Sequence, residues 1–390
     1  MKKLLHFFLL LPFLSLAQSK TFTGTIRESG NNQPIEMVSI GVENFNVGTV
    51  TNEEGKFRIT VPAEAKTLLF NHLNYKVSTY ELASGKSEID ILLEPAGYDL
   101  DEIVVTSKPV DQIFSDVLNT SKKRLEKSLL INTYGREFIS LNGKIVKFSD
   151  GLLDYYIKRK SGASDLFIKQ SRTFKLNQTE DKSDLESRKE AIAFYDITEA
   201  MEDAYDFKAI KTLTNTKEYD FELRTKKDNA GNELEIIKII PKPEVEKDLY
   251  IGSITYDAKT KLILEIDLKK SPEHQKYSKL YNFLIVKMKI NEFAKKINFK
   301  LDGDKYVMTY SQNRINFYVK TKKSFDDTFE FVNDFVMMDY KEGEFDFDRK
   351  LRFKKKGLFE AGNNIQNEYW KTSNIILLTS KEEKIIKSFE

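Results

Sequence analysis

The sequence predicts a mainly β protein: a seven-stranded antiparallel sandwich, followed by an α+β domain with a large curved antiparallel sheet and a few helices. Two observations predict this class. Apolar and polar residues alternate with period two in short runs, and Gly, Asn and Pro separate these runs. Hydrophobic residues make up 40% of the 390-residue chain, with 28 Phe and 18 Tyr, which is enough to fill sizeable cores.

The first 18 residues, MKKLLHFFLLLPFLSLAQ, have the layout of a secretory signal peptide. Lys2 and Lys3 form a basic start, an apolar run covers 4–16, and the small residue Ala17 follows. This run is shorter than the ~20 residues of a membrane-spanning helix. We therefore expect an exported protein with no transmembrane helix in the mature chain; an uncleaved N-terminal anchor is the alternative.

Composition excludes several classes of site. The chain has no Cys, so disulfides, cysteine-rich zinc sites, a cysteine nucleophile and an acylated lipoprotein N-terminus are absent. Export without disulfides suits a bacterial envelope. The 62 Lys and Arg nearly balance the 60 Asp and Glu, and loss of Lys2 and Lys3 makes the balance even. We expect no nucleic-acid partner, and we interpret the basic run 352–356 as solvated surface.

Residues 20–96 are predicted to form the sandwich. Apolar residues alternate around Phe22, Val38, Phe57 and Ile89, and turns fall at 30–32, 52–55 and 84–85. In the turn of GTVTNEEGKFRI, Gly55 supplies a positive φ and Asn52 can bond to its own backbone, so neither residue is evidence for a site. The oxygen ligands that a calcium loop needs are missing beyond this turn.

The order of these pieces resembles a known family. Gly24-Thr25-Ile26, Gln33-Pro34-Ile35, Gly48-Thr49-Val50-Thr51 and Phe57-Arg58-Ile59 follow one another directly behind a signal peptide. This pattern is similar to the carboxypeptidase regulatory-like domain, a transthyretin-like (Ig-like) sandwich. In Bacteroidetes such domains often precede the plug of TonB-dependent transporters. The resemblance covers about residues 20–96 and implies an address in the cell envelope.

No catalytic, cofactor-binding or metal-binding residue is predicted. Zinc carboxypeptidases use two His and one Glu, but the mature chain has only His72 and His274, and neither lies in a His-x-x-Glu or His-Glu-x-x-His pattern. We interpret His72 as a strand-end residue and His274 as part of a loop. Gly-x-Ser-x-Gly, phosphate-loop and dinucleotide motifs are absent. Carboxylate pairs such as Asp326-Asp327 are too common to single out.

Residues 97–130 are predicted to be a linker and an amphipathic helix that Pro109 opens. Apolar residues at spacings of three and four form its stripe: Val110, Ile113, Phe114, Val117, Leu118, Leu125 and Leu129.

Residues 131–345 are predicted to form the curved sheet, with a helix near 183–207. A strand pair is expected at 249–256 and 261–268, and Tyr306, Met308 and Tyr310 are expected to share a face. Residues 346–390 are predicted to be a C-terminal helical tail, in which Ser380 and Glu383 form a capping box. The strand rhythm resembles the envelope half-barrels of LolA-like lipoprotein carriers, and a membrane barrel is the competing architecture.

Three functions remain open from the sequence. The first is a non-enzymatic binding or adaptor component in the periplasm or at the outer membrane, with an envelope protein as its partner. The second is a LolA-like carrier or sensor of an apolar ligand. The third is a hydrolase of unknown specificity, which would depend on His72, His274 or a carboxylate pair.

Overall fold

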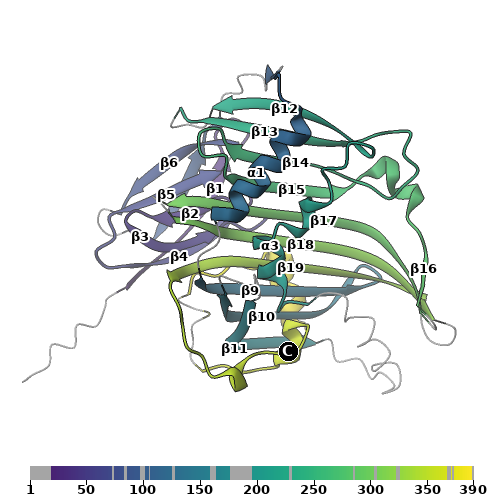
Figure 1. Cartoon of the computed structure of the whole chain (residues 1–390). Helices are drawn as coiled ribbons and strands as arrows, with labels where there is room; N and C mark the ends of the chain where they lie inside the picture. The colour runs from purple at the N-terminus through teal and green to yellow at the C-terminus, as the bar shows by residue number, and fades with distance from the viewer. Residues whose placement is uncertain are drawn as a thin grey trace, which may run out of the picture.

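The computed structural model describes residues 19–72, 74–82, 86–96, 102–104, 106–124, 128–158, 164–175, 196–227, 231–283, 286–302, 305–321, 326–366, 370 and 373–388. Three β-sheets form most of the described structure, and the helices are short and few. This architecture confirms the predicted mainly β class (Figure 1).

The sandwich consists of the seven predicted strands in two sheets. The first sheet has the order β4 (Lys56–Pro62), β1 (Ser19–Glu28), β7 (Glu88–Leu93), and the second has the order β3 (Phe45–Val50), β2 (Ser39–Val42), β5 (Thr67–His72), β6 (Tyr75–Glu81). All pairs are antiparallel except β1 with β7, which is parallel and departs from the expected pattern. Alternate side chains such as Ile26, Phe57 and Phe70 are fully buried between the sheets.

The linker leads into the larger sheet. Its β8 (Glu102–Ile103) pairs with β12, and α1 (Val110–Arg124) follows. The carbonyl of Pro109 accepts hydrogen bonds from the backbone N–H groups of the first helical turn, so Pro109 opens α1 as predicted. Phe114 and Val117 of the predicted stripe are buried. Leu129 is not on the helix, because it begins β9; Leu125 lies outside the described residues.

The large sheet has twelve strands, and every pairing in it is antiparallel. The predicted strand pair is β14 with β15, and β16 pairs with β17 beside the main path. The order is β11 (Ser164–Lys175), β10 (Lys144–Ile157), β9 (Leu129–Leu141), β19 (Asp326–Glu342), β18 (Lys305–Thr321), β17 (Val286–Asp302), β15 (Ile263–Lys270), β14 (Tyr250–Asp257), β13 (Glu233–Pro241), β12 (Tyr219–Lys227), β8; β16 covers Tyr281–Phe283.

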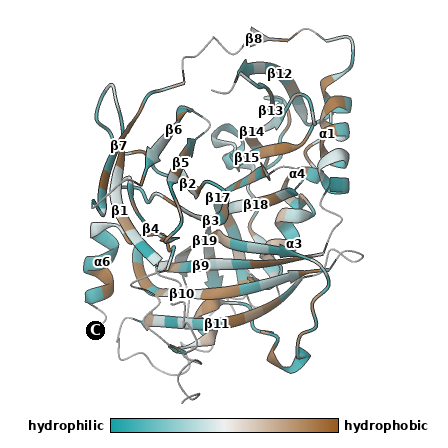
Figure 2. Ribbon diagram, turned by 90° about the vertical axis from the view of Figure 1, so that its left-hand side faces the viewer, coloured by the Kyte–Doolittle hydropathy of each residue, from teal (hydrophilic) through white to brown (hydrophobic). Residues whose placement is uncertain are grey.

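The large sheet lies between two layers, as Figure 2 shows. The sandwich and α6 (Ser380–Lys387) cover one face, which we call the sandwich side. Helices α1, α3 (Ala200–Tyr205) and α4 (Lys208–Lys211) cover the other, the helix side, and bury the largest apolar cluster. Of the helix expected near 183–207, residues 183–195 lie outside the described residues. Within the described residues, no helix is long and apolar enough to span a membrane.

A β-bulge corrects the prediction for β18. Met308 pairs with Phe299 and Tyr310 pairs with Asn298, so Thr309 is an extra residue. Because one extra residue reverses the alternation, Tyr310 points to the sandwich side and not to the same face as Tyr306 and Met308.

Two local predictions near the C-terminal half are also corrected. The stretch around His274 is a 3-10 helix, η1 (Pro272–Tyr277), and not a loop. Helix α6 is capped one residue earlier than expected: Thr379 accepts from the N–H of Glu382, and Glu382 accepts from the N–H of Thr379. Two further 3-10 turns, η2 (Arg349–Leu351) and η3 (Leu358–Ala361), precede it.

Candidate functional site

His72 lies at the end of β5, as predicted, where the sandwich approaches the large sheet. Its ring packs against Tyr75 at 5.1 Å between centroids, and its Nδ1 accepts from the N–H of Asn74. Burial, reinforced by the charges of Lys296 and Lys226 on the large sheet, lowers the pKa of His72 to about 4. His72 has no acid or hydroxyl partner in the part of the chain that the structure describes.

His274 forms a Ser–His contact that sequence reasoning missed. Ser271 directly precedes η1, and its hydroxyl lies 2.9 Å from Nδ1 of His274. Nε2 of His274 lies 3.1 Å from the carbonyl oxygen of Lys242, so this nitrogen carries the proton and Ser271 donates to Nδ1. Only 3% of Ser271 and 2% of His274 are exposed. A substrate carbonyl cannot approach this hydroxyl, and we interpret the pair as a structural clamp.

Two of the carboxylates, Asp326 and Asp348, are likewise engaged in local contacts. Asp326 accepts from Lys320 at 2.6 Å and from Tyr318, and Asp348 caps η2 through the N–H of Lys350. Among the described residues, no group of three or more potential metal-ligating side chains comes together. The expectation that the chain carries no catalytic, cofactor or metal site stays a prediction.

The distinctive site is the junction between the sandwich and the large sheet. An extended C-terminal segment, residues 373–380, lies in it, and we call this segment the strap. On its sandwich side, the backbone N–H and C=O of Thr60 in β4 both bond to the side-chain amide of Asn374, at 2.6 and 3.2 Å. Thr49 donates to the carbonyl of Ile375 at 3.4 Å. The strap therefore satisfies backbone groups on the open edge of β4.

The turn 52–55 binds the end of the strap. Gly55 has a φ of 71°, and Oδ1 of Asn52 accepts from the N–H groups of Glu54 and Lys56, as the turn geometry predicted. The other half of the Asn52 amide donates to the carbonyls of Leu377 and Leu378, at 3.2 and 3.3 Å. The carboxylate of Glu54 accepts from the N–H and hydroxyl of Ser380. The sequence-based interpretation missed this second role of the turn.

On the opposite side, the strap packs onto the large sheet. Ile375 and Ile376 are buried among Val50 of the sandwich and Tyr134 and Tyr310 of the sheet. Leu378 and α6 continue this contact over the aromatic side chains of β9, β10 and β11. One segment thus joins both modules through apolar contacts on one side and hydrogen bonds on the other.

A buried row of alternating charges lies beneath the strap. Asp334, Arg136, Asp150 and Arg172 are directly opposite one another on β19, β9, β10 and β11. Nε of Arg136 lies 2.6 Å from Asp334, and Arg172 binds both oxygens of Asp150, at 2.7 and 2.8 Å. Glu382 of α6 lies 3.8 Å from Arg136. Since buried charges are tolerated only when paired, the row is paired within the sheet, and Glu382 brings α6 to its Arg136.

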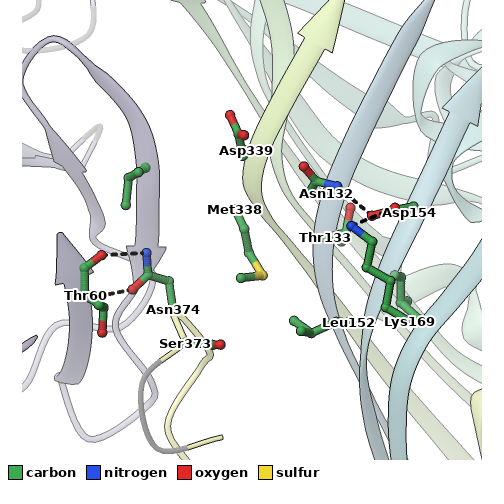
Figure 3. Close-up of a pocket in the computed structure, with 12 residues that line it drawn as sticks. Thr60, Asn132, Thr133, Leu152, Asp154, Lys169, Met338, Asp339, Ser373 and Asn374 are labelled. Atoms are coloured by element: carbon green, nitrogen blue, oxygen red, sulfur yellow. Dashed lines mark hydrogen bonds and ion pairs between the residues drawn. The ribbon is translucent and has the colours of Figure 1, made fainter. Parts of the chain in front are cut away.

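A cavity of about 370 Å³ opens beside the strap (Figure 3). Its walls come from the sandwich, the strap and strands β9, β10, β11 and β19. Asp154 accepts from Asn132 at 2.6 Å and pairs with Lys169 at 2.8 Å, and Met338 and Leu152 supply apolar surface. The lining thus combines charged and amide groups with a larger share of apolar surface.

Comparison with solved structures finds distant likenesses. A DUF1329 family protein from Desulfovibrio piger is 13% identical, with 63% of this chain and 98% of that chain covered and a TM-score of 0.25. A LolA superfamily protein from Nitrosomonas europaea is 11% identical, with coverages of 62% and 97% and a TM-score of 0.21. A membrane-associated protein of unknown function from Bacteroides fragilis is 10% identical, with coverages of 83% and 98% and a TM-score of 0.16. These scores are too low to bear on function.

Comparison with family models gives a match to the first module. No curated protein matches the chain. Residues 22–105 match the family model of the CarboxypepD_reg-like domain, and this match confirms the resemblance drawn from the order of the sandwich motifs.

Proposed function

We propose that this protein is a non-enzymatic binding or adaptor component of a bacterial cell envelope, in the periplasm or at the outer membrane. The signal-peptide pattern and the CarboxypepD_reg-like domain support the address, and the transporter-associated resemblance supports a Bacteroidetes source. Residues 20–96 would serve as the contact module and residues 131–345 as its support, with the tail 346–390 joining the two.

The strap is the observation that carries this proposal. It bonds to β3, β4 and the turn of the sandwich while its other face lies in the core of the sheet domain. A sandwich held in this way is a rigid platform, and preorganised surfaces bind partners at lower entropic cost. Two large apolar side chains of this platform are exposed, Val77 at 47% and Leu92 at 60%.

Site-specific photo-crosslinking in intact cells tests the proposal. A photoreactive phenylalanine analogue replaces Val77 or Leu92, and the control position is Leu351, an exposed apolar residue of the C-terminal tail. We expect a discrete adduct with one envelope protein from a sandwich position and none from Leu351. If every position gives only the unmodified protein, while the chain is correctly exported, the adaptor proposal is wrong.

A carrier or sensor of an apolar ligand is the second candidate. In its favour, the helix side of the curved sheet carries two large apolar clusters, one around Ile297 and Phe335 and one around Phe317 and Phe331. The described members of both clusters are buried, so a ligand would have to displace covering elements. Native mass spectrometry of the purified protein tests this candidate, because a carrier retains a lipid adduct and an adaptor gives the mass of the chain alone.

A further inference from the structure

The C-terminal tail contains a strongly basic stretch, residues 349–356, which we call the basic segment. Six of its eight residues are Lys or Arg and none is acidic. Asp346 and Asp348 precede it, and Asp348 accepts from the N–H of Lys350. All six cationic residues are exposed, in agreement with the solvated surface expected for 352–356. Because the chain as a whole is almost neutral, this segment is a local concentration of positive charge.

The basic segment is held against the β11 edge of the large sheet. The N–H of Phe353 donates to the carbonyl of Leu166 in β11 at 2.7 Å. Just before the segment, Phe347 stacks on Phe167 of β11 with 4.6 Å between ring centroids. In Figure 1 the segment lies in the yellow-green chain that runs below β11. Its backbone is therefore fixed at the border of the molecule while its cationic side chains extend into solvent.

Half of these charges have no internal counter-charge. Arg352 pairs with Asp165 at 2.9 Å, and Lys355 donates to the backbone carbonyl of Glu360 at 3.1 Å. Three further cations form no ion pair with any residue that the structure describes: Arg349, Lys350 and Lys354. These three side chains are available to an external anion.

An apolar side chain projects from the middle of this positive charge. Leu351 is 72% exposed, which is the largest fraction among the exposed large hydrophobic residues of the described chain. Ile365 is 57% exposed and follows Asn364, which pairs with Ser171 farther along β11. Single exposed apolar residues are ordinary, but Leu351 has a cation on each side. This combination fits a surface that is anionic outside and apolar beneath.

We propose that the basic segment docks on an anionic phospholipid surface, with its cations at the head groups and Leu351 inserted into the interface. Each Lys or Arg close to such a surface adds to the attraction, and an inserted apolar side chain strengthens it further. The exposure of Leu351 favours a membrane over an acidic protein, because a lipid interface accepts an apolar side chain anywhere, whereas a protein needs a matching pocket.

This docking is independent of the adaptor proposal, because it uses the tail and not the sandwich. Contact of Leu351 with lipid also agrees with the absence of a protein adduct that we expect from that position.

Flotation of the purified protein with lipid vesicles tests the docking. One vesicle preparation contains phosphatidylcholine alone, and the other also contains phosphatidylglycerol, which is anionic. We expect the wild type to float with the anionic vesicles only. We expect this binding to be lost at high salt, because salt screens exposed charges.

Two triple variants remove the same number of charges from different places. The test variant carries Arg349→Gln, Lys350→Gln and Lys354→Gln. The control replaces three exposed lysines outside the tail and carries Lys211→Gln, Lys217→Gln and Lys259→Gln. We expect at least tenfold weaker binding to anionic vesicles in the test variant, and binding like that of the wild type in the control.

A second pair of variants tests the insertion. Leu351→Ser is expected to weaken binding to anionic vesicles several-fold, since it removes the apolar group but no charge. Leu92→Ser is the control, because Leu92 is an exposed residue of the sandwich. We expect it to bind like the wild type.

Several results would overturn the docking. Equal weakening in both triple variants would show a response to net charge and not to the basic segment. Equal binding to both kinds of vesicle, or unchanged binding in Leu351→Ser, would contradict the combination of charge and insertion. Absence of binding to either vesicle would also overturn it, and a protein adduct from a photoreactive residue at position 354 would then assign the segment to an acidic protein. The crosslinking result from the sandwich is unaffected, so the two proposals fail separately.

Discussion

Glu137 illustrates how one buried carboxyl makes stability depend on pH. Its pKa rises from 4.5 to about 7 because burial disfavours the charged form. A carboxyl whose pKa is higher in the folded state contributes stability that is fully present below pH 4.5 and is lost as the pH rises through 7. His72 acts in the opposite sense, since its pKa of about 4 makes its contribution fall as the pH drops below 6.5.

Replacement of Glu137 by Gln is expected to remove the pH dependence of stability that Glu137 causes. Gln is neutral at every pH and can still accept from Asn333. Between pH 5 and 8, the free energy of unfolding of the wild type should fall relative to that of Glu137→Gln by roughly 3 kcal/mol. Urea unfolding at several pH values measures this difference, and parallel pH profiles for the two proteins would contradict it.

At the scale of strands, the close approach of β1 to β7 depends on Gly24. A Cβ at this position would lie 1.8 Å from the carbonyl oxygen of Ile89 and 2.8 Å from the ring of Phe57. The obstructing atom is backbone of the paired strand, so it cannot move aside without opening the β1–β7 pairing.

Gly24→Ala should therefore destabilise the sandwich by roughly 2–3 kcal/mol through overpacking. Gly41 is a matched control, because it also lies in a sandwich strand and a Cβ there would have no neighbour within 4 Å. Gly41→Ala is expected to change stability by less than about 0.5 kcal/mol. Urea unfolding of both variants measures the difference. Equal midpoints would contradict the prediction, because they would show that β7 moves aside at little cost in free energy.

Period-two alternation was sufficient to predict the sandwich strands and many strands of the large sheet, because one face of each is buried. The bulge at Thr309 was not predictable, since a single extra residue leaves no local signal while it reverses the face of Tyr310. Leu129 was assigned to the helix because its spacing of four from Leu125 fits the helical period, although the same spacing also fits the period-two pattern of a strand. At Thr379, two adjacent capping patterns compete, and packing of α6 selects the earlier one.

The junction was even less predictable from sequence. Asn52 has every feature of an ordinary turn residue, and its bonds to Leu377 and Leu378 span more than 300 positions. The strap does not follow from local pattern, because its contacts depend on which strands become neighbours.

At the scale of the whole molecule, the strap sets how the two modules dock. His72 reports on this docking, because burial and the charges of two lysines from the large sheet, Lys296 and Lys226, depress its pKa to about 4. Undocking would return its pKa toward the ordinary value of 6.5. His274, buried within the large-sheet module, provides an internal reference in the same spectrum.

Asn52→Asp combined with Asn374→Asp should loosen the docking without disturbing either fold. Each Asp keeps the oxygen that accepts from backbone N–H groups, but it places a carboxylate against carbonyl oxygens where an N–H donated before. Asn215→Asp is the control, since the Asn215 side chain only accepts from the N–H of Lys217 in an exposed turn.

Titration of the His72 ring protons by NMR measures the outcome. We expect a midpoint near 4 in the wild type and in Asn215→Asp, and a midpoint that moves toward 6.5 in the double variant. A double variant that retains the low midpoint, with His274 unchanged in all three proteins, would mean that contacts other than the strap fix the sandwich on the sheet. The apolar cluster that joins Val50 of the sandwich to Val336 of the large sheet would then hold the docking, because it contains residues of both modules.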